Sequence, residues 1–257
     1  MKKTIMSSKS TYFIANWKMN GSPKDLIQIK NLDFFVKNRF KKHNKLIVYC
    51  PPQPLITYFA KKIRSKNIKF GSQDLSGNSS AFGAFTGEVS SHILKNSGAE
   101  YVIIGHSEKR LAGDNYNTIK QKINNANQNK LKIIFCIGES LKEKKNKNSL
   151  LILKKQILAS LEKGLNFKNI LFAYEPVWSI GTGIIPSQSY LIKIFSELKK
   201  ILIRHYSVKS PKLLYGGSVN AQNIQSLKMI PNCNGYLIGG ASLMSKNFID
   251  IIQNYYS

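Results

Sequence analysis

The chain of 257 residues contains few cysteines and no long apolar run. Its three cysteines, Cys50, Cys136 and Cys233, lie far apart, which fits neither a disulfide framework nor a paired metal-ligand spacing. Residues 1–10 are basic and polar where a secretory signal needs an apolar stretch, and no segment approaches the length that crosses a membrane. We therefore expect a cytoplasmic protein, kept in a reducing compartment, with no membrane segment.

Acidic residues are also scarce, since 13 Asp and Glu stand against 39 Lys and Arg, for a formal net charge of +26. Such an excess raises the question of a polyanionic partner. The lysines are scattered along amphipathic segments such as 120–132 and 193–204, without a nucleic-acid-binding motif or an aromatic platform for bases. We interpret the charge as a solvated basic surface and expect no specific nucleic-acid partner. Attraction of anionic metabolites and incidental nucleic-acid binding remain as alternatives.

What the chain does contain is apolar material for a core, with 42% hydrophobic and 20% charged residues. Short β-rich runs alternate with longer amphipathic stretches, which predicts parallel strands joined by crossover helices. The strand candidates are residues 12–16, 46–50, 68–71, 101–105, 132–137, 170–174, 212–215 and 235–238. The helical candidates include residues 25–40, 117–129, 149–163, 187–205 and 220–228.

Eight strand candidates favour a closed eight-stranded parallel (β/α)8 barrel over an open doubly wound sheet. The length agrees, because such barrels commonly occupy about 250 residues as one domain. We expect a single domain over residues 1–257, in which residues 1–10 form a flexible N-terminal extension.

Polar residues and glycines gather where these strands end, and that rim is where barrel enzymes place their chemistry. The residues that follow the strands are Asn16, Lys18, Gln73, His106, Glu108, Glu139, Glu175, Gly216, Gly217, Ser218, Gly239 and Gly240. The pattern predicts one site built from several loops at the mouth of the barrel.

Glu175 is a candidate base, because it ends a strand and is followed by Pro176, which fixes the exit of the chain. A partly desolvated carboxylate at the mouth can remove a proton from carbon next to a carbonyl. Standing alone, it is equally well explained as a strand-end glutamate in an ion pair.

His106 precedes a predicted helix start at Ser107, and a helix N-terminus disfavours a charged imidazole. A neutral ring can donate a hydrogen bond to a substrate oxygen, although a lone histidine is more often structural. Lys18 offers a cation for a phosphate or an enolate oxygen, but in a lysine-rich chain it is equally a surface residue.

Glycine-rich loops at 216–218 and 239–242 follow the last two strands and expose backbone amides. This is the recurrent anion site of phosphate-binding barrels, although tight turns also need glycine. Neither a P-loop nor a dinucleotide fingerprint is present, since 181–183 lacks the third glycine.

Taken together, five ordered motifs resemble those of the triosephosphate isomerase family along nearly the whole chain. They are 16–21 (NWKMNG), 105–108 (GHSE), 174–183 (YEPVWSIGTG), 215–219 (YGGSV) and 239–243 (GGASL). The chain departs from the family pattern at Ser179, where alanine is frequent, at Lys109, where arginine is usual, and at Ser91, where proline often stands. The segment 74–82 is slightly longer than expected.

The resemblance implies interconversion of dihydroxyacetone phosphate and glyceraldehyde 3-phosphate, in glycolysis and gluconeogenesis, without cofactor or metal. As is known for that family, Glu175 would act as base and neutral His106 as electrophile, under a water-excluding lid at 176–183. Lys18 and Asn16 would also bind substrate, and Glu108 would support them. The resemblance further implies phosphate contacts from Gly181, Ser218, Gly239 and Gly240. It also implies a homodimer in which Thr86 contacts the partner.

Two other interpretations are compatible with parts of the pattern. Another phosphosugar barrel, such as an epimerase or an indole-forming synthase, would share the phosphate loops but would not need this lid. A catalytically silent barrel that binds phosphate or nucleic acid would fit the net charge of +26, but not the intact set Asn16, Lys18, His106 and Glu175.

Overall fold

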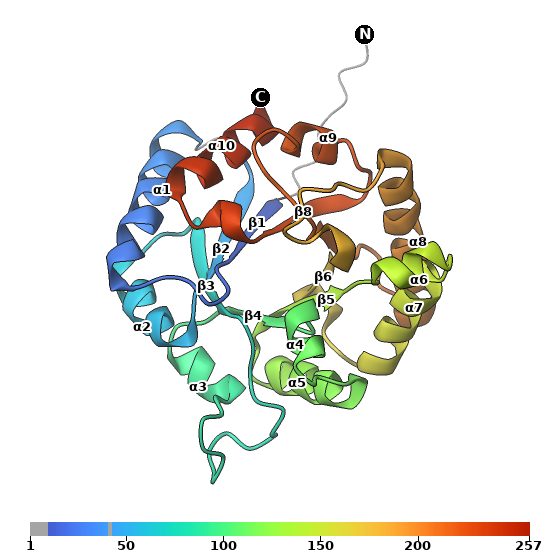
Figure 1. Ribbon diagram of the computed structural model, residues 1–257. Helices are drawn as coiled ribbons and strands as arrows, with labels where there is room; N and C mark the ends of the chain where they lie inside the picture. Colours follow the sequence, from blue (N-terminus) through green and yellow to red (C-terminus); the bar gives the residue numbers. More distant parts are fainter. Residues whose placement is uncertain (1–9, 41–42) are drawn as a thin grey trace.

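The computed structural model describes residues 10–40 and 43–257, so the expected N-terminal extension lies almost entirely outside the described residues. Within them, parallel strands close into a barrel in chain order, with β8 hydrogen-bonded to β1 (Figure 1). The strands are β1 (Thr11–Asn16), β2 (Lys45–Cys50), β3 (Ile68–Ser72), β4 (Tyr101–Ile104), β5 (Lys132–Ile137), β6 (Ile170–Tyr174), β7 (Lys212–Tyr215) and β8 (Cys233–Ile238). The predicted closed eight-stranded barrel is confirmed. Each predicted strand is present, with ends that agree or differ by one or two residues.

Helices surround the barrel and cover its outer face (Figure 1). They are α1 (Leu26–Arg39), α2 (Gln53–Lys62), α3 (Ser91–Asn96), α4 (Ser107–Leu111), α5 (Tyr116–Gln128), α6 (Leu141–Lys145), α7 (Ser149–Ser160), α8 (Gln188–Tyr206), α9 (Ile224–Lys228) and α10 (Ser245–Tyr256). Short 3₁₀ turns include η3 (Val177–Ser179) in the lid and η4 (Gly240–Ser242) after β8. No helix among the described residues is long and apolar enough to cross a membrane.

One helix starts later than predicted, at Ile224 instead of residue 220. The side-chain oxygen of Asn220 accepts hydrogen bonds from the N–H groups of Gln222 and Asn223, at 3.0 and 2.9 Å. Such a local side-chain contact stabilises a turn in competition with the helix, and it delays the first helical residue.

Each strand alternates between two buried layers, because both faces of a parallel barrel sheet are covered. One set of side chains fills the barrel interior and includes Ile14, Cys50, Ile103, Leu171 and Ala173. The other set packs between the strands and the helices. Cys50 and Cys136 lie in the interior layer and are fully buried.

Candidate active site

The alternation of the strands decides which polar residues enter the mouth of the barrel. On β6, Leu171 and Ala173 point to the interior, so Glu175, two residues further on, points the same way. On β1 the same rule carries Asn16 inward after Ile14. Both polar side chains are therefore buried, with 2% and 5% of the surface of Glu175 and Asn16 exposed.

Two glycines leave room for Glu175. A Cβ atom on Gly138 would lie 1.8 Å from the carbonyl oxygen of Glu175, and one on Gly216 would lie 2.9 Å from its Cγ. Any larger residue at Gly138 would collide with the backbone that carries the glutamate. The absence of side chains at these neighbouring strand ends thus lets the carboxylate sit deep in the mouth.

The Glu175 carboxylate lies against the segment that follows β4. Its Oε1 lies 3.2 Å from Nε2 of His106, and its Oε2 accepts the N–H of Ser107 at 3.3 Å. Burial raises the pKa of Glu175 above its ordinary value, while the nearby His106 and the Ser107 amide act in the opposite direction. A carboxylate with a raised pKa is a stronger base, as proton abstraction from carbon requires.

His106 is the N-cap of α4 and is buried. Its Nδ1 accepts the N–H of Glu108 at 3.3 Å, so Nδ1 carries no hydrogen and the hydrogen of a neutral ring is on Nε2. That Nε2 lies 3.2 Å from Oε1 of Glu175. The sequence predicted a hydrogen-bond donor at this helix start, and Nε2 is the ring nitrogen that faces the carboxylate.

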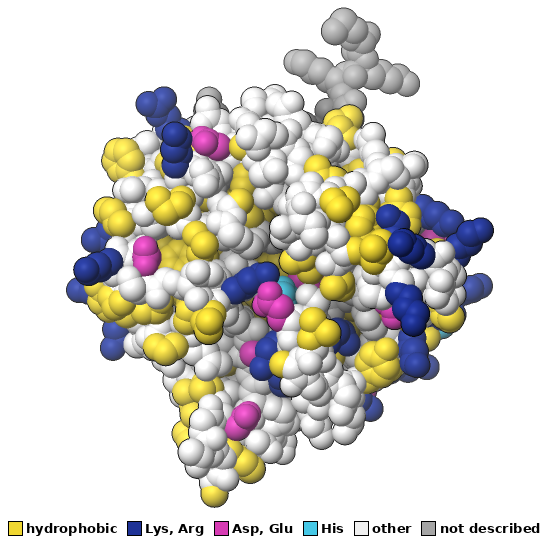
Figure 2. Space-filling view, viewed as in Figure 1, with side chains coloured by type: hydrophobic (Ala, Val, Ile, Leu, Met, Phe, Trp, Pro, Cys, Tyr) yellow, Lys and Arg dark blue, Asp and Glu magenta, His cyan; other side chains and the backbone are white. Residues whose placement is uncertain are grey.

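Lys18 is held in an uncommon backbone conformation, with φ of 53°. Its N–H donates to Oδ1 of Asn16 at 3.2 Å, and its carbonyl accepts from Nε2 of Gln73 at 2.8 Å. Its Nζ pairs with Oε1 of Glu108 at 2.7 Å. Figure 2 shows basic, acidic and histidine side chains together over the centre of the barrel, in agreement with these contacts.

A cavity of about 290 Å³ joins this cluster to the glycine loops. Its lining includes eight residues predicted from the sequence to act on or bind substrate: Asn16, Lys18, His106, Glu175, Gly181, Ser218, Gly239 and Gly240. The volume suits a small metabolite. Glu108, predicted to support the site, and Thr86, predicted to contact a partner subunit, line a larger adjoining cavity of about 810 Å³, which Asn16, Lys18 and His106 also border.

The segment 176–183 spans the side of the smaller cavity and has defined ends. Gly181 and Gly183 have φ of 70° and 75°, a conformation that favours glycine. At the first end, Nε1 of Trp178 donates to Oε1 of Glu139 at 3.0 Å, and Nζ of Lys144 lies 3.5 Å from the centre of the indole. The sequence placed Glu139 on the rim without a role, and the structure makes it an anchor of the lid.

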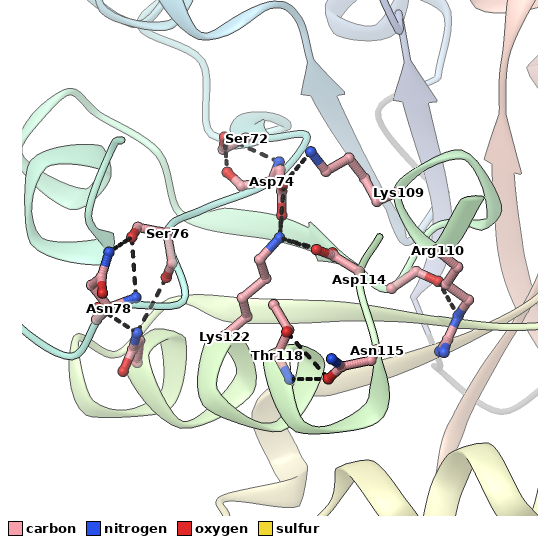
Figure 3. Close-up of polar contacts among 12 residues, drawn as sticks. Ser72, Asp74, Ser76, Asn78, Lys109, Arg110, Asp114, Asn115, Thr118 and Lys122 are labelled. Atoms are coloured by element: carbon pink, nitrogen blue, oxygen red, sulfur yellow. Dashed lines mark hydrogen bonds and ion pairs between the residues drawn. The ribbon is translucent and has the colours of Figure 1, made fainter. Parts of the chain in front are cut away.

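The loop after β3 is fixed to α4 and α5 by an ion-pair network (Figure 3). Nζ of Lys122, a buried lysine on α5, lies between Asp74 and Asp114, with contacts of 2.8 to 3.0 Å to both carboxylates. Lys109 adds a second cation, 3.0 Å from Asp74. The segment that carries Thr86 is therefore supported at its base next to the candidate site.

Sequence reasoning assigned no function to Gln73, although its amide bridges the carbonyls of Lys18 and Cys50. Its position directly after β3 was the available signal. Among the described residues, no group of three or more His, Cys, Asp or Glu side chains is arranged to hold a metal ion.

Comparison with known proteins agrees with this geometry. A family model described as triosephosphate isomerase matches residues 11–255. The chain belongs to the triosephosphate isomerase family. It is 34% identical to the triosephosphate isomerase of Alkaliphilus oremlandii over 244 residues, which cover 93% of this chain and 96% of the relative. It is 37% identical to that of Bradyrhizobium diazoefficiens over 241 residues, covering 93% and 94%.

The crystal structure of triosephosphate isomerase from Bartonella henselae superposes with a TM-score of 0.87 at 30% identity. The alignment covers 96% of this chain and 99% of that structure. The chain is thus an isomerase of the triosephosphate isomerase family in sequence and in fold, and the resemblance inferred from the five motifs is confirmed.

Proposed function

We propose that Glu175, His106, Lys18 and Asn16 carry out the reaction of this family on this chain, the interconversion of dihydroxyacetone phosphate and D-glyceraldehyde 3-phosphate. The observation that supports this most directly is the 3.2 Å approach of Nε2 of His106 to the buried Glu175 carboxylate, in a cavity that also reaches the glycine loops. The pathway roles that follow are glycolysis and gluconeogenesis.

In the forward direction, Glu175 removes a proton from C1 of dihydroxyacetone phosphate, and the C–H electrons form a C1–C2 double bond. Negative charge develops on the C2 oxygen, which accepts a hydrogen bond from Nε2 of His106, the ring nitrogen that lies 3.2 Å from Glu175 Oε1. Lys18 adds a positive charge nearby, and Asn16 a further polar contact. Return of the proton from Glu175 to C2, with proton transfer between the two oxygens, yields the aldehyde.

The phosphate is held at the other end of the cavity by backbone amides. Gly181 approaches from the lid, Ser218 follows β7, and Gly239 and Gly240 follow β8. Amides around an anion supply partial positive charge without a proton that can leave, so the dianion is fixed while the carbons react. The proposal needs no cofactor and no metal, and it places all of this chemistry on one barrel domain.

The test is to supply glyceraldehyde 3-phosphate to the purified protein in chelator and to follow dihydroxyacetone phosphate. Rapid conversion is expected. Folded protein that binds a phosphate analogue in the cavity without conversion would instead support the silent barrel. Loss of conversion in chelator, with recovery on adding a divalent cation, would reject the metal-free assignment.

We also propose a homodimer formed through the face that carries Thr86. Large apolar side chains stand exposed on the loops at this face. Met19 and Phe85 border the same cavity as Thr86 and are 96% and 42% exposed, and Phe82, in the same loop as Phe85, is 70% exposed. Large exposed apolar groups that gather on one face of a soluble protein mark an interface. The 810 Å³ cavity bordered by Phe85 and Thr86 would receive the same loop of a second copy.

Sedimentation at micromolar concentration should report twice the 29.0 kDa chain mass. Phe82→Ser should weaken the dimer. Phe34→Ser is the matched control, because Phe34 on α1 is 71% exposed but lies away from this face. Equal effects of both substitutions, or a fully active monomeric wild type, would reject the interface.

We further propose that the protein is cytoplasmic and that its basic surface is solvated without a specific partner. If the charge helps to capture the dianionic substrate, kcat/KM falls with ionic strength more than kcat does. Equal salt responses of kcat/KM and kcat identify the surface as solvated only.

A further inference from the structure

Ser179 is the last residue of η3 and lies in the first arm of the lid, which we define as residues 176–180. Its side chain is fully buried. The second arm, residues 181–185, runs two residues past the predicted lid segment 176–183 and is exposed. A buried polar side chain costs free energy unless its hydrogen bonds are made, so the partners of this hydroxyl define what it does.

The Ser179 hydroxyl joins three separate parts of the chain. It donates a short hydrogen bond to the carbonyl of Ile184, in the second arm of the lid. It also lies 3.3 Å from the hydroxyl of Tyr215, the last residue of β7. One oxygen atom therefore connects both arms of the lid to the strand end from which the phosphate loop 216–218 leaves.

The direction of these two hydrogen bonds follows from the single hydrogen of a serine hydroxyl. Because Ser179 donates to Ile184, Tyr215 must be the donor to Ser179. Tyr215 is suited to this, since burial raises its pKa to about 12 and it keeps its hydrogen at neutral pH. A chain of two hydrogen bonds thus runs from Tyr215 through Ser179 to Ile184.

The second arm has few other means of attachment. Pro186, which follows it, is buried but lacks an N–H and donates no backbone hydrogen bond. The Ile184 N–H is used within the lid, where it donates to the Thr182 hydroxyl at 3.2 Å. The Thr182 hydroxyl in turn donates to the carbonyl of Trp178 in the first arm, at 3.3 Å. The Ile184 carbonyl connects the second arm to the end of β7, through Ser179 and Tyr215.

We propose that Ser179 is a positioning residue for the isomerisation, whose hydroxyl holds the two lid arms together over the phosphate loops so that the Gly181 amide faces the substrate phosphate. The inference rests on the proposed function, because it assigns a role in that reaction to a residue outside the substrate cavity. It also gives a purpose to the serine at a position where this family frequently has alanine.

The consequence concerns the fate of the enediolate. When the lid is loose, the C–O bond to phosphate breaks, the electron pair leaves with the phosphate, and the remaining enol tautomerises to methylglyoxal. Ser179→Ala removes only the hydroxyl. It should lower kcat by roughly three- to tenfold, because the free energy of one hydrogen bond, added to the activation barrier, corresponds to a rate change of about that size. The change in KM should be smaller. Methylglyoxal formed per isomerisation should rise by about the same factor.

The matched control is Ser160→Ala. Ser160 is also fully buried, and its Oγ has no hydrogen-bond partner within residues 10–40 and 43–257. It lies at the end of α7 and should leave the product ratio unchanged. Tyr215→Phe tests the other end of the chain of hydrogen bonds. If Ser179 acts through Tyr215, the double variant Ser179→Ala/Tyr215→Phe should be no worse than the poorer single variant.

A Ser179→Ala enzyme with unchanged kcat and unchanged methylglyoxal per turnover would overturn the inference. So would full additivity of the two substitutions, or a raised product ratio in Ser160→Ala as well. The wild-type assay separates this from the proposed function, because isomerisation by the wild type establishes the reaction whatever the variants do. Loss of folding in Ser179→Ala is detected by its melting temperature, and Tyr215→Phe alone then decides the product ratio.

Discussion

Glu139 and Glu175 follow neighbouring strands, β5 and β6, and both are almost completely buried. Burial raises the pKa of each above its ordinary value. Yet Glu175 faces the substrate cavity, whereas Glu139 faces the layer between the barrel and its helices. There Oε1 of Glu139 accepts hydrogen bonds from Tyr174, Trp178 and Tyr190, at 2.9 to 3.0 Å.

The difference comes from the alternation of side chains between the two faces of each strand. Glu175 continues the interior set Leu171 and Ala173, while Glu139 continues the outer set that ends with Ile137 on β5. A shift of one residue along either strand would exchange the two environments. Similar burial and a raised pKa thus describe a candidate base in one place and an anchor of the lid in the other, so the pKa direction alone does not identify a catalytic carboxylate.

The largest effect expected is on removal of the Glu175 charge. Glu175→Gln keeps the shape of the side chain but cannot accept a proton from carbon, so kcat should fall by roughly 10² to 10⁴. The measurement is the steady-state rate of isomerisation, with circular dichroism as the check on folding. Activity within a few-fold of wild type would reject Glu175 as the base and remove the contrast with Glu139.

Substituting a residue that contacts Glu175 should lower kcat more than substituting a residue that contacts Glu139. His106→Gln places a donor differently and should lower kcat by roughly 10² to 10³, the range for loss of one stabilising donor. Tyr190→Phe removes one of the three donors to Glu139 and should cost only a few-fold. A proton titration by NMR should show a neutral His106 ring near pH 7. A charged ring there would contradict the hydrogen-bond assignment.

Glu139→Gln should have an intermediate effect. The amide oxygen can still accept from Tyr174 and Trp178, but a neutral acceptor forms weaker hydrogen bonds than a carboxylate. We expect kcat to fall by about tenfold or less, with more methylglyoxal per turnover because the lid is loosened. If Glu139→Gln were as inactive as Glu175→Gln, the anchoring role would be wrong.

The smallest effect concerns stability. A raised pKa in the folded state means that the native protein binds more protons than the unfolded chain between the two pKa values, so stability falls as pH rises through that window. At pH values above that window, the folded protein carries the full free-energy cost of the buried Glu175 charge. Glu175→Gln should therefore have a higher melting temperature than wild type at pH 7, by about 2–4 °C for each kcal/mol of unfolding free energy gained. The gain should disappear below the ordinary pKa of glutamate. A gain that is the same at every pH would attribute it to packing instead.

The sequence by itself indicated the eight strands, their alternation with helices and the identity of the residues at each strand end. Those features are local, because apolar periodicity, strand length and the glycine at a strand end depend on a few adjacent residues. Asn16, Lys18, His106 and Glu175 were therefore identified from motifs, and the structure places all four around one cavity.

Only the tertiary structure decided which contacts these residues make. Glu139 meets Tyr190 across 51 residues, Lys122 meets Asp74 across 48, and Ser179 meets Tyr215 across 36. None of these pairs has a spacing that a local pattern specifies. They form because closing the barrel brings successive strand ends and their loops together, and burial then favours a partner for most polar groups.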